Sequence, residues 1–379
     1  MEKESREFQV FVKPVGALCN LRCRYCYYLD KKNLRLPEEP LIMNEDILEK
    51  YIVQHIEATT DETIFFSWHG GEPLMAGIDF FRKVVTLQNK HKPSGVEILN
   101  GVQTNGTLID NKWGWFFAEN NFLVGISIDG PGEMHNRFRT TSDGRSSLHE
   151  VLRGYEILTR YRIKSEILCV VNSYNVRFPL IIYNFFKELG AGYITFLPLV
   201  ERRHGAKSGV SRATVPSLEF GRFLISVFDE WIERDIGEIK IQIFEEAART
   251  AFNQEHTLCI FRENCGGVPV VERNGDFYSC DHFVNNDYLI GNIKNGSVAD
   301  FLDGEKQKVF GHAKSLTLPR YCIECEVKAM CNGECPKNRF IATPDGESGL
   351  NYLCSGYKAF FNHCRPFVEA VAAVSGKQV

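Results

Sequence analysis

The strongest constraint on the fold is an alternation of strand-like and helix-like segments through the first two thirds of the chain. Segments rich in β-branched and aromatic residues, typical of strands, occur at residues 8–14, 63–70, 96–104, 122–130, 165–172 and 193–200. Amphipathic, helix-like segments lie between them, as at residues 44–58, 78–91 and 178–192. Such alternation predicts an α/β fold with a parallel sheet, either open or closed into a barrel.

Unusual short motifs follow four of these predicted strands. They read CNLRCRYC at residues 19–26, HGGEP at 69–73, TNGT at 104–107 and SIDGP at 127–131. In β/α barrels the active site is built at the carboxyl ends of the strands. We therefore expect these loops to carry the chemistry of the protein.

The bulk composition excludes several classes of partner and location. The 379 residues carry a formal net charge of -4, which does not favour binding to nucleic acid or to an anionic membrane surface. The chain has no apolar run long enough to cross a membrane, and its first residues lack the apolar core of a signal peptide. A cytoplasmic location is therefore expected.

Thirteen cysteines are unusual for a cytoplasmic chain, because that compartment keeps thiols reduced. An odd count also argues against complete disulfide pairing, so metal ligation is the better interpretation. Cys19, Cys23 and Cys26 form a C-x3-C-x2-C motif. Three thiolates can hold three corners of a [4Fe–4S] cluster and leave the fourth iron open for a ligand. The alternative is a zinc site that a distant residue completes.

The texture of the sequence changes after residue 258, where cysteines become dense and regular periodicity weakens. We expect one domain over residues 1–240 and a second over residues 241–379, which ends in a helix. Eight of its thiols are enough for two fully ligated four-iron clusters, although two zinc sites of four cysteines each would fit as well. Cys169 and Cys364 lie outside both arrays and are expected to be small buried hydrophobic residues.

The N-terminal cysteine motif together with GGEP resembles the radical S-adenosylmethionine (SAM) superfamily. The resemblance implies a partial (β/α)6 TIM-like barrel and a cluster whose open iron binds the amino and carboxylate groups of SAM. Reductive cleavage of SAM then yields a 5′-deoxyadenosyl radical. Gly70, Gly71 and Glu72 correspond to the segment that meets the methionine amino group. The resemblance places further SAM contacts at Tyr25, Tyr28, Ser127, Arg139 and Leu199.

The C-terminal array resembles the SPASM extension, a small, irregular, cysteine-rich domain of peptide-modifying radical SAM enzymes. The resemblance assigns one auxiliary [4Fe–4S] cluster to Cys259, Cys265, Cys280 and Cys335. It assigns the other to Cys322, Cys325, Cys331 and Cys354. A fully ligated cluster has no open iron, so its expected role is to move an electron, with a potential tuned by burial and hydrogen bonds.

Asp281, directly after Cys280, narrows the resemblance to the anaerobic sulfatase-maturating enzymes. These enzymes oxidise one cysteine or serine of a sulfatase to Cα-formylglycine, and an aspartate at this position is their proposed general base. Burial beside a cluster is expected to raise the pKa of that carboxyl. The implied partners are a sulfatase polypeptide with a C/S-x-P/A-x-R type motif and a small electron donor such as flavodoxin or ferredoxin.

Two other functions remain open. A SPASM maturase of a ribosomally made peptide would form thioethers or other crosslinks, but such enzymes often carry an N-terminal leader-binding domain, for which the predicted first strand near residue 8 leaves no room. A non-enzymatic metal-binding or electron-transfer protein would not need an open iron. The sequence does not reveal the particular substrate, the cysteine or serine preference, the reductant or the oligomeric state.

Overall fold

The computed structural model describes residues 7–29, 31, 39–203 and 209–375. These residues divide into two compact units, each made of segments that are distant in sequence. The first unit contains residues 1–127, 136–165 and 266–311, and the second contains residues 128–135, 166–265 and 312–379. The domain boundary expected between residues 240 and 241 stays a prediction.

The first unit is built on parallel strands. Its strand order is β10-β9-β8-β1-β2-β3-β4, in which β1, β2, β3, β4 and β8 run parallel and the β8–β9–β10 meander is antiparallel. Its strands are β1 (Phe11–Lys13), β2 (Thr63–Trp68), β3 (Glu97–Thr104), β4 (Phe122–Ser127), β8 (Val270–Glu272), β9 (Asp276–Tyr278) and β10 (Leu289–Asn292). Its helices are α1 (Glu45–Ala58), α2 (Ile78–His91), α3 (Asn111–Glu119), α5 (Leu148–Arg160) and α9 (Val298–Asp303).

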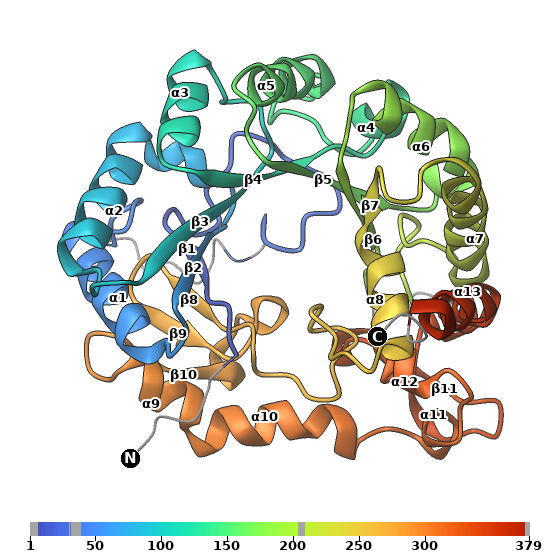
Figure 1. Cartoon of the computed structure of the whole chain (residues 1–379). Helices are drawn as coiled ribbons and strands as arrows, with labels where there is room; N and C mark the ends of the chain where they lie inside the picture. The colour runs from blue at the N-terminus through green and yellow to red at the C-terminus, as the bar shows by residue number, and fades with distance from the viewer. Residues whose placement is uncertain (1–6, 30, 32–38, 204–208, 376–379) are drawn as a thin grey trace. The chain divides into compact units, whose positions relative to one another are not determined.

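Local sequence explains why α1 forms and packs. The side chain of Asn44 caps it by accepting a hydrogen bond from Ile47 N at 2.9 Å. Leu48, Tyr51 and Ile52 recur at helical spacing and are buried, so one face of the helix joins the core. Figure 1 shows α1 and α2 side by side along β1–β3.

The second unit has a shorter parallel array, of order β5-β6-β7, with helices and a small hairpin. Its strands are β5 (Ser165–Val171), β6 (Tyr193–Pro198), β7 (Lys240–Ile241), β11 (Arg339–Ala342) and β12 (Ser348–Asn351). Its helices are α6 (Pro179–Glu188), α7 (Ser217–Arg234), α8 (Gln242–Ala251), α11 (Arg320–Ile323), α12 (Lys328–Cys331) and α13 (Cys354–Ser375). Helices α4 (Glu133–Asn136) and α10 (Glu305–Leu316) each cross a boundary of the division.

The predicted strands and helices of the first two thirds are confirmed, with shorter strand ends. The predicted strand over residues 8–14, for example, is reduced to Phe11–Lys13, whereas the helix over residues 78–91 is observed in full. The cysteine-rich part is more regular than its weak periodicity suggested, because the short strands β8 and β9 gain their order by pairing on β1.

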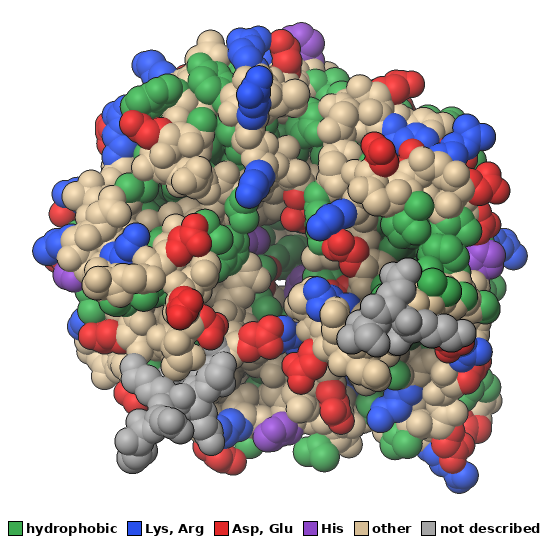
Figure 2. All heavy atoms as spheres, in the orientation of Figure 1, with side chains coloured by type: hydrophobic (Ala, Val, Ile, Leu, Met, Phe, Trp, Pro, Cys, Tyr) green, Lys and Arg blue, Asp and Glu red, His purple; other side chains and the backbone are tan. Residues whose placement is uncertain are grey.

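The surface carries both signs of charge. Figure 2 shows Lys and Arg side chains interspersed with Asp and Glu side chains over the face that it draws. Within the described ranges, none of the helices has both the length and the apolar character needed to cross a membrane.

Two cysteines outside both arrays test how far packing explains the remaining thiols. Cys169 in β5 and Cys364 in α13 are fully buried among apolar residues. We expect Cys169→Ala and Cys364→Ala to lower the free energy of unfolding by roughly 1 kcal/mol each, because a small buried side chain is truncated. Iron content, measured after anaerobic reconstitution, should equal that of the unmodified protein. A loss of about four irons from either variant would identify that residue as a cluster ligand instead.

Candidate active site

The ends of β1, β2 and β3 meet at one edge of the sheet in the first unit, and the predicted catalytic loops start there. The loop with Cys19, Cys23 and Cys26 follows β1, the HGGEP turn follows β2, and the TNGT segment starts at the last residue of β3. Parallel pairing of β1 with β2 and of β2 with β3 forces these ends together. The clustering expected from the sequence is therefore present.

The three-cysteine loop has the properties of a ligand set. The Cys19 sulfur accepts weak hydrogen bonds from Leu21 N at 3.4 Å and from Asn105 Nδ2 at 3.8 Å. Burial raises the pKa of Cys19 to about 12, and the neighbouring charges of Glu72, Cys23 and Cys26 raise it further. Thiols this close and this buried lose their protons readily only to a positively charged group, so the donor set fits an iron–sulfur cluster.

The GGEP turn interlocks with this loop through backbone alone. Gly71 N donates to Gly16 O at 2.7 Å, and Glu72 N donates to Leu18 O at 2.8 Å. A Cβ on Gly71 would lie 2.1 Å from the Leu18 carbonyl oxygen, which no side chain can accommodate. Close approach of two backbones thus explains this glycine, independently of any contact with SAM.

Glu72 joins the turn to the next strand end. Its buried carboxylate accepts hydrogen bonds from Asn105 N at 2.7 Å, Thr104 Oγ1 at 2.8 Å and Leu74 N at 3.0 Å. Burial raises the pKa of Glu72 to about 7, against these hydrogen bonds, which lower it. The side chain is a brace between HGGEP and TNGT, and its predicted contact with SAM stays a prediction.

The other residues predicted to contact SAM are distributed as follows. The buried Arg139 guanidinium lies over the Tyr25 ring, 5.5 Å from the ring centroid. Ser127 Oγ accepts from Gln103 Nε2 at 3.3 Å at the end of β4. Leu199 belongs to the second unit, where its N–H donates to Val171 O at 2.8 Å. The structure thus brings Tyr25 and Arg139 together, and the SAM roles of all four remain predictions.

Asp281 lies in a buried polar network that sequence reasoning did not predict. Its Oδ1 lies 2.6 Å from Lys13 Nζ as an ion pair, without the alignment of a hydrogen bond. The Tyr27 hydroxyl donates a short hydrogen bond to Oδ2. Lys13 is almost completely buried, so its charge requires this carboxylate as a partner.

This network corrects the expected behaviour of the carboxyl. Burial alone would raise the pKa of Asp281, but Lys13, His282 and the hydrogen bond from Tyr27 together hold it well below its usual range. The expectation of a raised pKa was wrong because a lysine inside a strand supplies a compensating charge. Asp281 is consequently ionised throughout the physiological pH range.

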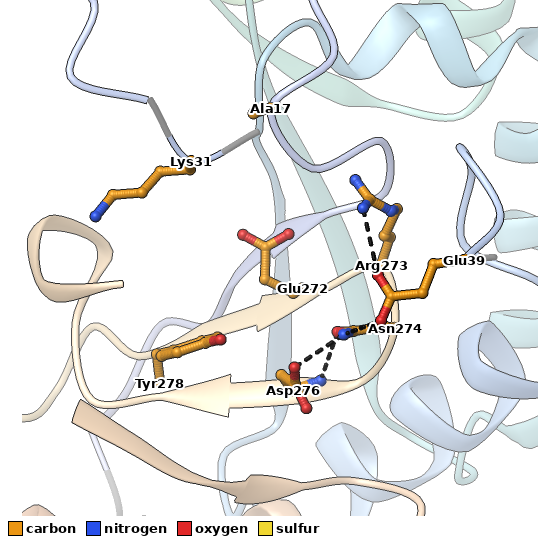
Figure 3. Close-up of a pocket in the computed structure, with 8 residues that line it drawn as sticks. All are labelled: Ala17, Lys31, Glu39, Glu272, Arg273, Asn274, Asp276 and Tyr278. Atoms are coloured by element: carbon orange, nitrogen blue, oxygen red, sulfur yellow. Dashed lines mark hydrogen bonds and ion pairs between the residues drawn. The ribbon is translucent and has the colours of Figure 1, made fainter. Parts of the chain in front are cut away.

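Tyr28 is part of the same network. Its hydroxyl donates a short hydrogen bond to Glu272 Oε1 on β8, and the Lys13 ammonium lies 4.4 Å from its ring centroid. Figure 3 shows Glu272 pointing from β8 into a pocket that Lys31, Asp276 and Tyr278 also line. Tyr28 therefore links this pocket to the surroundings of Asp281.

His69 is a further residue that the sequence analysis did not assign. Its ring stacks on Phe11 with centroids 3.8 Å apart, and its Nε2 lies 2.9 Å from Ser67 Oγ. Burial lowers the pKa of His69 to about 3, and the nearby Lys13 charge lowers it further, so the imidazole is neutral. Strand-end position was the available signal for His69 and Lys13, since each lies where β2 or β1 ends.

The second unit gathers the four cysteines assigned to one auxiliary cluster. Cys322 lies in α11, Cys331 ends α12 and Cys354 starts α13, with Cys325 between the first two helices. Burial raises the pKa of Cys331 to about 12 and that of Cys354 to about 11, and in both cases neighbouring thiolates of this set raise it further. The four thiols therefore lie within electrostatic range of one another.

The other predicted set is distributed over both units. Cys259 and Cys265 belong to the second unit and affect each other electrostatically, since burial and then the Cys265 charge raise the pKa of Cys259 to about 11. Cys335 belongs to the same unit, whereas Cys280 belongs to the first. The assignment of these four residues to one cluster stays a prediction.

Comparison with known families matches both parts of the chain. Residues 14–177 match the radical SAM superfamily, and residues 259–326 match an iron–sulfur cluster-binding domain of the SPASM type. The chain therefore has the radical SAM fold, and the two domains account for [4Fe–4S] clusters and SAM as its cofactors.

Relatives cover nearly the whole chain. A serine-type anaerobic sulfatase-maturating enzyme of Bacteroides thetaiotaomicron is 42% identical over 96% of this chain and 91% of its own length. A cysteine-type anaerobic sulfatase-maturating enzyme of Clostridium perfringens is 32% identical over 96% of this chain and 98% of its own length. The chain thus resembles enzymes of both substrate types.

Solved structures agree with these matches. Native anSMEcpe with bound AdoMet and Cp18Cys peptide superposes with a TM-score of 0.87 at 31% identity, over 96% of this chain and 98% of that chain. Streptococcus suis SuiB bound to S-adenosylmethionine, at a TM-score of 0.62 and 15% identity over 88% of this chain and 74% of that chain, shares the fold. The identity and coverage of its relatives show that this chain belongs to the anaerobic sulfatase-maturating enzymes of the radical SAM superfamily.

Proposed function

We propose that this chain oxidises the side chain of one serine or cysteine in a sulfatase polypeptide to Cα-formylglycine. The observation that carries the proposal is the buried Lys13–Asp281–Tyr27 network at the same sheet edge as the three-cysteine loop. This arrangement provides an ionised carboxylate beside a site suited to a SAM-binding cluster. The serine-type and cysteine-type relatives support the substrate class.

The residues of the chain have separable roles in this proposal. Cys19, Cys23 and Cys26 would hold the cluster, and SAM bound there would supply the 5′-deoxyadenosyl radical that takes a hydrogen atom from the substrate β-carbon. Tyr25 and Arg139 are proposed to contact the adenine and the carboxylate of SAM, with Ser127 and Leu199 at the ribose and adenine. Gly70, Gly71 and Glu72 shape the turn beside the cysteine loop.

Asp281 is proposed to accept the proton from the substrate hydroxyl or thiol. Lys13 and Tyr27 hold its two oxygens in one orientation, so the acceptor does not have to be ordered when substrate binds. Because its pKa lies below the usual range, the carboxylate is always ready to accept a proton but is only modestly basic. That balance suits a proton that has become acidic through loss of the neighbouring hydrogen atom.

The finer partners are part of the same proposal. We infer a substrate segment of the C/S-x-P/A-x-R type and a small electron donor such as flavodoxin or ferredoxin, in the cytoplasm. Peptides that differ only in serine, cysteine or alanine at the first position should be incubated anaerobically with the protein, SAM and reductant. Mass spectrometry should detect the aldehyde in the serine peptide, the cysteine peptide or both, and never in the alanine peptide. No aldehyde in any peptide or in an intact sulfatase would refute the proposal.

Replacing Cys19, Cys23 and Cys26 together by Ala should remove one cluster and leave the auxiliary sites intact. Total iron is expected to fall to about two thirds of the unmodified value, since two of three four-iron clusters remain. Formation of 5′-deoxyadenosine should be abolished. Iron determination and chromatography of the nucleoside check both outcomes, and complete loss of iron would contradict the assignment of separate sites.

Replacing Asp281 by Asn should separate SAM cleavage from product formation. Formylglycine formation is expected to fall by a factor on the order of a hundred or more, because an amide cannot accept the proton. Formation of 5′-deoxyadenosine should persist. The ratio of formylglycine to 5′-deoxyadenosine, measured by mass spectrometry, is the test.

The substitution also leaves the buried Lys13 charge unpaired, which costs about 3–5 kcal/mol of stability. The matched control is therefore the double variant Lys13→Met with Asp281→Asn, which removes both charges. If the double variant keeps its iron and still lacks formylglycine, misfolding does not explain the loss. Formylglycine at the unmodified rate in Asp281→Asn would exclude Asp281 as the base.

A further inference from the structure

A turn in the second unit has an unusual backbone. Asn332, Gly333 and Glu334 are consecutive and all left-handed, with φ of 45°, 69° and 52°. Residues other than glycine disfavour this region, and they keep it only where the surroundings enforce it. The turn separates Cys331 from Cys335, which are assigned to different auxiliary clusters.

One guanidinium holds this turn in place. Arg339, the first residue of β11, donates to Gly333 O from Nε at 2.8 Å. Its Nη2 donates to Asn332 O at 2.8 Å and to Glu334 O at 3.1 Å, and its Nη1 donates to Lys314 O at 2.5 Å. Three carbonyls of the strained turn therefore converge on one fixed positive charge, located between a ligand of each set.

A second cation lies on the side of the other predicted ligands. Lys314, in the last turn of α10, is 1% exposed. Its ammonium donates to Cys259 O at 2.9 Å and to Ile260 O at 2.8 Å. The thiolates with which it interacts are those of Cys265 and Cys259.

Neither cation has a carboxylate partner within 4 Å in the described part of the chain, and their hydrogen bonds go to neutral backbone carbonyls. Buried charges are normally paired, because an unpaired one is costly to remove from water. The negative groups that do act on Arg339 include the thiolates of Cys322, Cys265 and Cys331, taken from both ligand sets. The missing counter-charge therefore matches anionic clusters held by these thiolates.

We propose that Arg339 and Lys314 are the counter-charges of the auxiliary clusters and raise their reduction potentials. A cluster that gains an electron becomes more negative, so a nearby buried cation stabilises its reduced form more than its oxidised form. Lys314 acts on the cluster at Cys259 and Cys265, whereas Arg339 acts on both clusters. The inference rests on the ligand assignment within the proposed function.

The proposed reaction explains the need for such tuning. Oxidation of the substrate side chain to an aldehyde removes one hydrogen atom, taken by the deoxyadenosyl radical, one proton, accepted by Asp281, and one electron. A neighbouring auxiliary cluster with a raised potential is a suitable acceptor for that single electron and can pass it to another one-electron carrier.

The test is a redox titration monitored by electron paramagnetic resonance. The full chain is used with Cys19, Cys23 and Cys26 replaced by Ala, so that only auxiliary clusters contribute a signal. In this background Lys314→Gln should lower the potential of one cluster, by roughly tenfold in its reduction equilibrium constant, or about 59 mV for a one-electron couple. Arg339→Gln should lower both potentials.

Two controls separate charge from structure. Arg339→Lys keeps the charge but loses most of the hydrogen bonds to the turn, so its potentials should stay near those of the parent. Arg320→Gln removes an exposed arginine two residues before Cys322, whose partner is Glu324, and should shift neither potential because water screens its charge.

The outcomes are distinct. Unchanged potentials in Lys314→Gln and Arg339→Gln at full iron content would overturn the proposal, as would equal shifts of both clusters in Lys314→Gln. Loss of iron from both variants would show that these residues only shape the sites, and would overturn it too. Potentials are measured without substrate, so a failure of the sulfatase assignment would appear in the peptide assay and not here.

Discussion

The pairing of the short strand β1 on both of its edges determines the geometry of the candidate active site. β1 pairs in parallel with β2 on one side and with β8 on the other, although β8 comes from the cysteine-rich part of the chain. The register places Lys13 opposite Glu272. As a result the cysteine loop, the HGGEP turn and the β8–β9 hairpin all start from one sheet edge, and Asp281 follows directly from that hairpin.

Charge compensation by one buried lysine governs the chemistry at this edge. Lys13 pairs with Asp281, lies over the Tyr28 ring and helps to keep His69 neutral. A neutral residue at this position would leave the Asp281 carboxylate to the full effect of burial, which raises its pKa. The state of the proposed base is therefore a property of the β1–β2–β8 packing and not of the Cys-Asp motif alone.

Backbone carbonyls, rather than carboxylates, hold the two buried cations of the second unit. Carbonyl dipoles fix the positions of Arg339 and Lys314 without neutralising their charge, so that charge stays available to an anionic group. The first unit follows the opposite principle, since its buried lysine is neutralised by a carboxylate within the chain. This contrast separates a site for proton transfer from sites suited to holding an electron.

The sequence alone determined the α/β class, the strand-end position of the motifs and the three cysteine sets, since strand periodicity and ligand spacing are local properties of the chain. It also singled out Asp281, through its place next to Cys280. Only the tertiary structure decided that Lys13, Tyr27 and Tyr28 surround that carboxyl, that Gly71 is required by the Leu18 carbonyl, and that β8 joins β1. Those contacts join residues far apart in sequence, and a lysine within a strand or a tyrosine beside a cysteine has no local pattern that names its partner. The sign of the Asp281 pKa shift was missed for the same reason, because burial and the compensating charge are both products of the folded chain.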